Sequence, residues 1–303
     1  MRFGLCCLFL EQPVKFRQTT AKTLLTLSRR ERIRKVSALC LENANSLLRS
    51  VETVRCLGIG AFRVMSPLFP RYTHPEVGYA LEDLPDAEHI SSVLTQVKAL
   101  CNKENVRLSF HPDQFIVLSS PSPEVVKKSV AELDYQAMLA EIIGADVINI
   151  HGGGVYGDKA AALQRFRETF EGLPERVKER LALENDDISY TVEDLKPVCE
   201  DLSIPLVYDV HHHRCNPDCY GVDEATRVCI ESWRNSGRGE PYLHVSSPKH
   251  GWQGTNPKPH ADYIDINDFP VAWRKLNLTV DVEAKAKELA VLKLMRELEE
   301  RHL

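Results

Sequence analysis

A short apolar run followed by an amphipathic segment recurs eight times along this chain, and this alternation constrains the fold more than any other feature. Runs of β-branched and aliphatic residues are typical of strands that are covered on both faces. The expected strands are Arg2–Leu8, Ala61–Met65, Arg107–His111, Val147–His151, Leu181–Asn185, Leu206–Asp209, Tyr242–Ser246 and Leu278–Glu283. Eight strand–helix units predict an α/β protein with a parallel sheet, and its closed form, a (β/α)8 TIM barrel, is the expected architecture.

The segments between these strands show helical periodicity. Ser28-Arg29-Arg30-Glu31 is a capping box that opens a long helix ending near Leu57. Further helices are expected at about Asp86–Lys103, Pro123–Ile143, Lys159–Glu171, Val192–Leu202, Val222–Ser236 and Glu283–Arg301. An open doubly wound sheet is the structural alternative, but it would normally carry a Gly-rich turn where this chain has Cys6-Cys7-Leu8. Without a linker, residues 1–303 are expected to form a single domain.

Composition excludes several classes of protein. No apolar run reaches the length of a membrane span, and Glu11 and Gln12 follow the apolar start of the chain in place of a signal-peptide cleavage site. The nine scattered cysteines fit the reducing cytoplasm, where we expect the protein. A net charge of −5 argues against non-specific coating of nucleic acid. It does not exclude a DNA enzyme, because divalent ions add local positive charge.

Metal-competent side chains stand at the ends of six successive predicted strands and in the loops that follow them. They are His111, His151, Glu184, Asp209, His212, His244, His260 and Glu283. Imidazoles and carboxylates are the usual ligands of zinc and manganese, and strand ends converge at the catalytic face of a barrel. A lone histidine there is more often an ordinary core residue, whereas a carboxylate that closes an apolar strand, such as Glu184, needs a partner. The repeated pattern therefore predicts a metal centre.

This ligand set is larger than one ion requires. Two or three divalent ions that share a bridging carboxylate fit it better. Such clusters suit phosphodiester hydrolysis, because the ions activate water and stabilise the charge that develops on the phosphate and the leaving oxygen.

Six motifs resemble the UV damage endonuclease family, which is related to endonuclease IV. They are Phe110-His111-Pro112-Asp113-Gln114-Phe115, Ile150-His151-Gly152-Gly153, Leu183-Glu184-Asn185-Asp186, Asp209-Val210-His211-His212-His213, His244-Val245-Ser246-Ser247 and Val282-Glu283-Ala284-Lys285. The likeness follows the same order over nearly the whole chain.

The resemblance implies a monomeric endonuclease that nicks duplex DNA 5′ to ultraviolet photoproducts, namely cyclobutane pyrimidine dimers and 6-4 photoproducts. It implies two to three divalent ions, Mn2+ first, with Zn2+ and Mg2+ as alternatives, and neither an organic cofactor nor a membrane partner. By its motifs, the first ion is held by His111, His151 and Glu184, and Glu184 bridges to a second held by Asp209, His244 and Glu283. His212 and His260 would hold the third ion.

The resemblance also assigns catalytic and DNA-binding residues. Glu184, Glu283, Lys249 and Tyr242 are the candidate catalytic residues. The family commonly has Lys at the position of Tyr242, and strand alternation puts this side chain on the same face as His244, so we expect it beside the metal or the phosphate. Gln114 and Phe115 are expected to act as a wedge in the duplex opposite the lesion; the family has Gln and an aromatic residue, usually Tyr, there.

One further departure and two competing functions remain open. The first strand offers Cys6, Cys7 and Leu8 where better-known members place Tyr and Asn near the lesion. A sugar isomerase or epimerase on the same barrel would also use carboxylates and imidazoles around one or two ions. A non-catalytic metal-binding regulator is the third reading. The number of imidazoles and the long loops 66–84 and 247–264 favour a large ligand and hence the nuclease.

Overall fold

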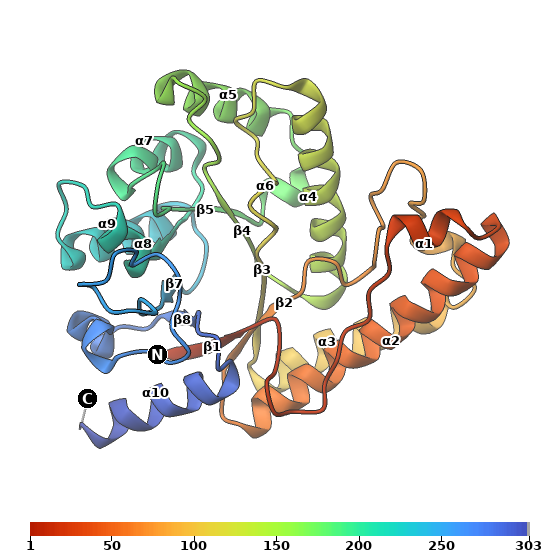
Figure 1. The fold of residues 1–303 in the computed structure, drawn as a ribbon, viewed down its shortest axis with the longest axis horizontal. Coiled ribbons are helices and arrows are strands. Elements are labelled where there is room, and N and C mark those ends of the chain that lie inside the picture. Colours follow the sequence, from red (N-terminus) through yellow and green to blue (C-terminus); the bar gives the residue numbers. More distant parts are fainter. Residues whose placement is uncertain (302–303) are drawn as a thin grey trace.

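The structure, a computed structural model that describes residues 1–301, contains a closed barrel of eight parallel strands in sequence order (Figure 1). The strands are β1 (Arg2–Cys6), β2 (Ala61–Val64), β3 (Arg107–Phe110), β4 (Val147–His151), β5 (Leu181–Glu184), β6 (Leu206–Asp209), β7 (Tyr242–Val245) and β8 (Thr279–Val282). Pairing of β8 with β1 closes the barrel. The predicted (β/α)8 barrel is confirmed. Several strands end one or two residues earlier than expected, so His111 and Glu283 lie just beyond the ladder.

Helices surround the barrel. They are α1 (Ala21–Leu25), α2 (Arg29–Cys56), α3 (Ala87–Glu104), α4 (Pro123–Ile143), α5 (Lys159–Glu171), α6 (Glu175–Lys178), α7 (Val192–Leu202), α8 (Val210–Cys215), α9 (Val222–Asn235) and α10 (Glu288–Glu300), with 3-10 turns η1 (Leu81–Asp83), η2 (Ile266–Asp268) and η3 (Val271–Lys275). The predicted capping box at Ser28 is present. None of the helices within residues 1–301 is long and apolar enough to cross a membrane.

The last helix begins at Glu288, not at Glu283 as expected. The reason is a set of backbone hydrogen bonds to the loop before η2. The N–H groups of Lys285 and Ala286 donate to the carbonyls of Ala261 and Asp262, at 3.0 Å each. These bonds hold residues 284–287 as a turn, which ties the long loop after β7 to the end of β8.

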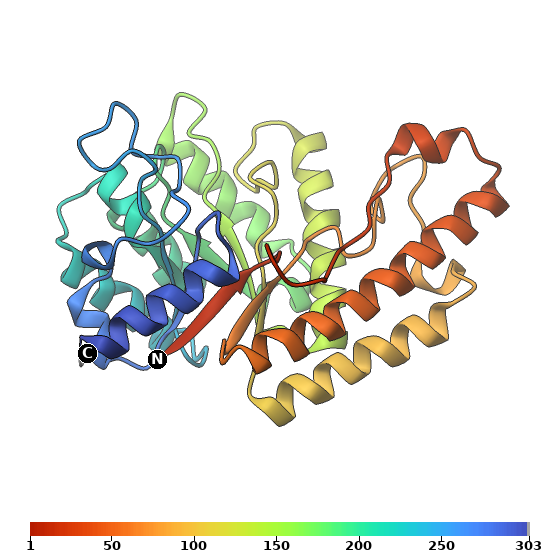
Figure 2. The ribbon, with the colours of Figure 1, turned by 60° about the horizontal axis from the view of Figure 1, so that its bottom comes forward.

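The interior of the barrel is apolar at the N-terminal ends of the strands and polar at their C-terminal ends. Alternation puts Val147, Asn149 and His151 on the same face of β4, in that order along the strand. Val147 packs with Tyr242 and Trp233 in a small buried cluster that also contains Ala182 and Val207. The imidazoles and carboxylates that could bind a metal lie at the opposite end, where Figure 2 shows the loops that follow the strands.

An arm projects from this barrel. We define the arm as residues 21–42, which comprise α1 and the N-terminal half of α2. In Figures 1 and 2 it reaches away from the barrel at the right of the view, while the C-terminal end of α2 leads into β2. α2 has 28 residues and is therefore about 42 Å long. The arm rises toward the side on which the loops after the strands lie.

Gly4 permits a close approach between β1 and β8. It is paired in register with Asp281, and a Cβ at this position would overlap the Asp281 carboxylate. Because both residues face the packed interior, the carboxylate has little room to move.

We expect Gly4→Ala to lower the free energy of unfolding by about 1–3 kcal/mol, the usual cost of overpacking a core. Urea denaturation measures the change. Gly239→Ala is the matched control, because a Cβ there would meet nothing within 4 Å. Equal stability of the two variants would show that Asp281 moves aside freely.

Candidate metal centre

Glu184 is the hub of the polar end of the barrel. It is the last residue of β5 and is fully buried. Its Oε2 lies 3.0 Å from Nε2 of His111, and its Oε1 lies 3.0 Å from Nδ1 of His244. Nδ1 of His212 is 3.4 Å from the same Oε1, and the amide of Asn149 donates to Oε2. One carboxylate thus contacts side chains from four other segments of the barrel.

Asp209 and His151 add donor atoms that have no protein partner. Asp209 Oδ1 accepts the backbone N–H of His212 at 2.8 Å, which caps α8 and fixes the carboxylate. The buried Asp209 Oδ2 forms no hydrogen bond with any residue in 1–301, and the same holds for Nδ1 of His151. Oδ2 lies 3.7 Å from Nδ1 of His212 and 4.0 Å from Nδ1 of His244. Both orphaned atoms therefore belong to the same cluster.

Glu283 completes the centre on the β8 side. Its Oε1 lies 2.6 Å from Nη1 of Arg63 and 3.5 Å from Nδ1 of His244. Its Oε2 lies 3.7 Å from Nδ1 of His260. His260 reaches the centre because an antiparallel bridge to Pro248 folds its loop back over the barrel.

The structure thus brings together all eight predicted metal ligands. Two groups of three side chains have donor atoms within 4.8 Å of one another: His111, Glu184 and His244, and His151, Glu184 and His212. Glu184 belongs to both groups, as a bridging carboxylate would. Imidazole and carboxylate donors with two orphaned buried atoms fit divalent transition-metal ions.

Burial and neighbouring charges shift the pKa values of Glu184, Glu283 and His151 in the direction that metal binding requires. Burial alone would raise the pKa of Glu184, but His244, His151 and hydrogen bonds from His111 and His212 outweigh it and hold the pKa well below its ordinary value. Burial is likewise outweighed at Glu283, where Arg63 lowers the pKa. Burial lowers the pKa of His151. The carboxylates are therefore ionised, and neutral His151 keeps a lone pair for a ligand.

The sequence analysis missed Arg63 and Asp281. Arg63 is buried on β2, with Nη2 3.0 Å from Asp281 Oδ2 and 2.9 Å from Nε2 of His244. Asp281 Oδ1 has no hydrogen bond within the described chain. The signal was present in the sequence: an arginine inside Ala61-Phe62-Arg63-Val64 and an aspartate inside Thr279-Val280-Asp281-Val282 are charged residues within apolar strands, and buried charge requires a partner.

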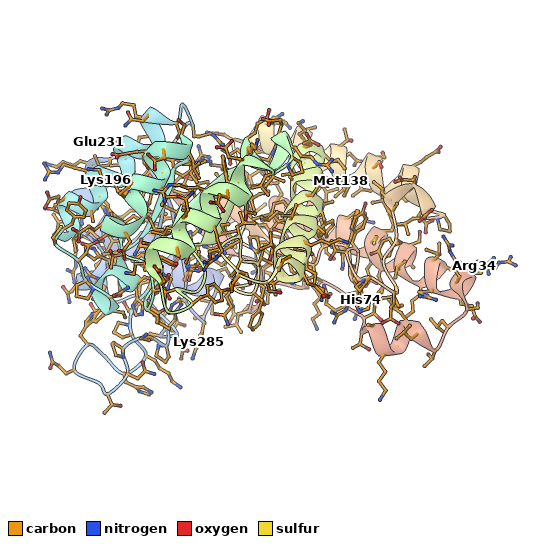
Figure 3. The ribbon with its side chains drawn as sticks, turned by 90° about the horizontal axis from the view of Figure 1, so that it is seen from above. Arg34, His74, Met138, Lys196, Glu231 and Lys285 are labelled. Atoms are coloured by element: carbon orange, nitrogen blue, oxygen red, sulfur yellow. The ribbon has the colours of Figure 1, made fainter. Side chains whose placement is uncertain are left out.

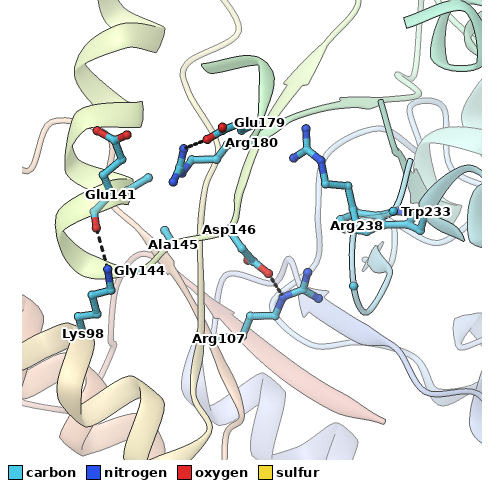
Figure 4. Close-up of a pocket in the computed structure, with 13 residues that line it drawn as sticks. Lys98, Arg107, Glu141, Gly144, Ala145, Asp146, Glu179, Arg180, Trp233 and Arg238 are labelled. Carbon is cyan, nitrogen blue, oxygen red and sulfur yellow. Dashed lines mark hydrogen bonds and ion pairs between the residues drawn. The ribbon is translucent and has the colours of Figure 1, made fainter. Parts of the chain in front are cut away.

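The side chains of the other two candidate catalytic residues form none of these contacts. Tyr242 faces the interior as expected, but it is at the N-terminal end of β7, where the guanidinium carbon of Arg107 lies 4.0 Å from its ring centre. Figure 4 shows Arg107 paired with Asp146 in this region, and Trp233 near it. The structure therefore does not place Tyr242 beside the metal ligands.

Lys249 is exposed in the loop after β7, and no ion pair of its side chain occurs among residues 1–301.

Gln114 and Phe115 follow β3 on the same side as the metal centre. Both are exposed, and the Phe115 side chain is 74% exposed. The N–H of Phe115 donates to Asp113 Oδ1 at 3.0 Å, which shapes the turn that presents the ring. Packing against the barrel, the alternative reading of Phe115, does not occur in this conformation.

We expect Tyr242→Lys to destabilise the fold by about 3 kcal/mol, because it would bury an unpaired cation beside Arg107. Tyr242→Phe is the control and should stay within about 1 kcal/mol of the parent, since the hydroxyl has no hydrogen-bond partner within the described residues. Urea unfolding at fixed pH measures both. A lysine variant that is as stable as the parent but has a different metal content would show that residue 242 lies at the metal centre.

Comparison with known proteins gives a consistent result. The sequence model of the family described as UV-endonuclease UvdE matches residues 1–302. The UV DNA damage endonuclease of Bacillus velezensis is 36% identical, over 98% of this chain and 93% of its own length. The crystal structure of SacUVDE is 28% identical, with a TM-score of 0.86, and the match covers 100% of this chain and 99% of that chain. Endonuclease IV from Thermus thermophilus is 16% identical, with a TM-score of 0.63 over 99% of this chain and 100% of that chain, which is a likeness of fold alone.

Proposed function

Because this chain belongs to the UV-endonuclease family, we propose that it is a metal-dependent DNA repair endonuclease that hydrolyses the phosphodiester 5′ to ultraviolet photoproducts in duplex DNA. The photoproducts are cyclobutane pyrimidine dimers and 6-4 photoproducts. The observation that carries the chemical part of this proposal is the position of Glu184, a buried carboxylate among imidazoles at the polar end of the barrel.

We assign the ligands as the family resemblance implies. His111, His151 and Glu184 would hold one ion; Glu184, Asp209, His244 and Glu283 a second; His212 and His260 a third. Mn2+ is the ion that we expect first, with Zn2+ or Mg2+ as alternatives. When bound, such ions polarise the phosphoryl oxygens and lower the pKa of water.

The protein side chains prepare the site for these ions and for the phosphate. The hydrogen bond from Asn149 and the hydrogen bond from His212 N–H orient the carboxylates of Glu184 and Asp209. Arg63 orients Glu283 through their 2.6 Å ion pair. Lys249, exposed on a loop of this end of the barrel, is proposed to contact a DNA phosphate. Its role is then binding, since its side chain forms no ion pair with the candidate ligands among residues 1–301.

Two exposed apolar side chains favour a large ligand over a sugar. Phe115 is 74% exposed in the loop after β3, and Ile188 is 71% exposed in the loop after β5. A sugar isomerase or epimerase binds a small substrate, whereas exposed side chains in two separate loops at one end of the barrel offer contacts to a large one. We propose that Gln114 and Phe115 form the wedge: the ring replaces lost base stacking, and the amide binds base edges that have lost their partner.

Chelation is expected to abolish nicking of irradiated plasmid, and added Mn2+ to restore it. Glu184→Ala and Glu283→Ala should each abolish nicking and lower the bound metal measured by elemental analysis, since each removes a charged ligand candidate. Circular dichroism checks that the barrel persists. Ordinary turnover with unchanged metal content in either variant would contradict the assignment.

The double variant Gln114→Ala and Phe115→Ala is expected to bind damaged duplex more weakly by about 1–3 kcal/mol, the range found for a lost stacking contact. Opening a base step costs least where the lesion already distorts it, so binding of undamaged duplex should change less. Fluorescence anisotropy measures both affinities, and metal content should stay constant. Val271→Ala, at an exposed apolar residue of η3, serves as the control. Unaltered affinity of the double variant would move the wedge to another loop.

A further inference from the structure

The arm carries a concentration of positive charge that the rest of the chain does not explain. Residues 21–42 contain six cations and two acids, although the whole chain has a net charge of −5. Both acids are engaged: Glu31 accepts from Ser28 in the capping box, and Glu42 pairs with Arg17 at 2.7 Å. Six cations less two acids leave the arm with a net charge of +4.

Five of these cations have no ionic partner. Lys22, Arg29, Arg30, Arg34 and Lys35 are exposed, and none of them forms an ion pair with any residue in 1–301. The sixth, Arg32, donates to the backbone carbonyl of Glu76 at 2.9 Å. We call these five residues the basic tip. Charged side chains on the barrel itself are commonly paired, as Arg167 is with Asp201 and Arg176 with Asp134.

The basic tip lies far from the metal centre but on the side of the catalytic loops. Figure 3 shows Arg34 at the end of the molecule opposite to Glu231, which is on α9, and Figure 2 shows the tip rising toward the level of the loops after the strands. α2 is about 42 Å long. One turn of duplex DNA is about 34–36 Å long. Because the C-terminal end of α2 leads into β2, the length of the helix sets the scale of the separation between the tip and the barrel, and that scale is comparable to one turn of duplex.

A groove lies beside α4 on this side of the molecule. It has a volume of about 920 Å3 and is lined by residues of the loops after β2 and β3 and of α4, among them Ser66, Arg71, Asp113 and Lys127. Asp113 adjoins the proposed wedge, and Arg71 lies toward the arm, where its Nε donates to the carbonyl of Thr19. The cationic and acidic side chains that line this groove balance one another, so the groove carries no net charge. The basic tip, by contrast, carries a net positive charge.

We propose that the basic tip binds the sugar–phosphate backbone of the same duplex, about one helical turn from the bond that is cut. This proposal rests on the proposed function, because it assumes that the metal centre acts on duplex DNA. The tip carries no base-reading geometry, so its contribution is independent of sequence and of the lesion. It strengthens binding of any duplex long enough to reach it, and it fixes the direction in which the duplex leaves the centre.

The test measures the salt dependence of binding without cleavage. A fluorescein-labelled duplex of about 40 bp with one central thymine dimer is titrated in chelator at several KCl concentrations. The variant Arg29→Gln, Arg30→Gln, Arg34→Gln should weaken binding roughly tenfold at 0.1 M KCl. It should also reduce the slope of log K against log salt by up to about 0.9 per lost contact. The single variant Arg34→Gln, expected to fold like the parent, should reduce the slope by about 0.9.

The matched control removes three exposed cations from the other side of the barrel, in the variant Arg227→Gln, Arg234→Gln, Lys275→Gln. Its slope should equal that of the parent. Shortening one flank of the duplex below about ten base pairs should weaken binding by the parent and leave the tip variant unaffected. A tip variant with the parental slope and the parental dependence on flank length overturns the proposal.

Nicking of irradiated plasmid with Mn2+, measured on the same preparations, separates this failure from failure of the proposed function. Nicking by the parent together with an unchanged slope of the tip variants rejects the tip alone. A parent that does not nick rejects the proposed function, and the proposal for the tip falls with it.

Discussion

The structure depends on how four carboxylates share the polar end of one barrel. Glu184, Asp209, Asp281 and Glu283 are all buried or nearly so, and unpaired buried charge is among the most costly features that a fold can contain. Arg63 offsets part of this charge through ion pairs with Asp281 and Glu283, while hydrogen bonds from imidazoles and amide groups surround Glu184. The remaining negative charge, together with the orphaned atoms of Asp209 and His151, is the physical reason that divalent cations fit this centre.

This concentration of charge is tolerated because the rest of the barrel interior is apolar and packed. Along β4 the inward side chains change from Val147 through Asn149 to His151, and at the N-terminal end of β7 Tyr242 packs with Trp233. Burial of apolar side chains at the N-terminal end stabilises the fold, which offsets the smaller apolar burial at the polar end. It also closes the barrel at that end, so that a substrate approaches from the loops. Gly4 belongs to the same arrangement, because only a residue without a Cβ leaves space for the carboxylate of Asp281.

The periodicity of apolar and polar residues predicted most of the fold and of the candidate metal centre. Each strand was recognised as an apolar run, and polar residues at the strand ends identified the eight candidate ligands, because parallel strands bring their C-terminal ends together. What the sequence did not reveal is how far along the barrel axis each inward-facing side chain lies. Alternation assigns Tyr242 and His244 to one face, but two residues along a strand are about 6.6 Å apart, enough to separate the metal centre from the packed end. The pairing of Arg63 with Glu283 and His244 depends on barrel closure between strands distant in sequence, which no local pattern contains. The projection of the arm was equally hidden, since a long amphipathic helix reads the same whether or not it extends past the barrel.

Positive charge is concentrated at one end of the molecule, so the net charge of −5 does not describe the charge that DNA would meet there. An average over the chain argues against binding of nucleic acid, yet the basic tip is positive and a loaded metal centre would be positive too. The negative charge elsewhere on the chain does not prevent association with a polyanion, because the potential that matters is local and is screened over about 10 Å at ordinary ionic strength. Uniform positive charge would permit a duplex to slide in any direction. Two attractive points separated by about one turn of the duplex restrict its orientation more. A repair enzyme that must find rare lesions would benefit from this restriction, because each encounter would then present the backbone to the proposed wedge at Phe115 in a similar geometry.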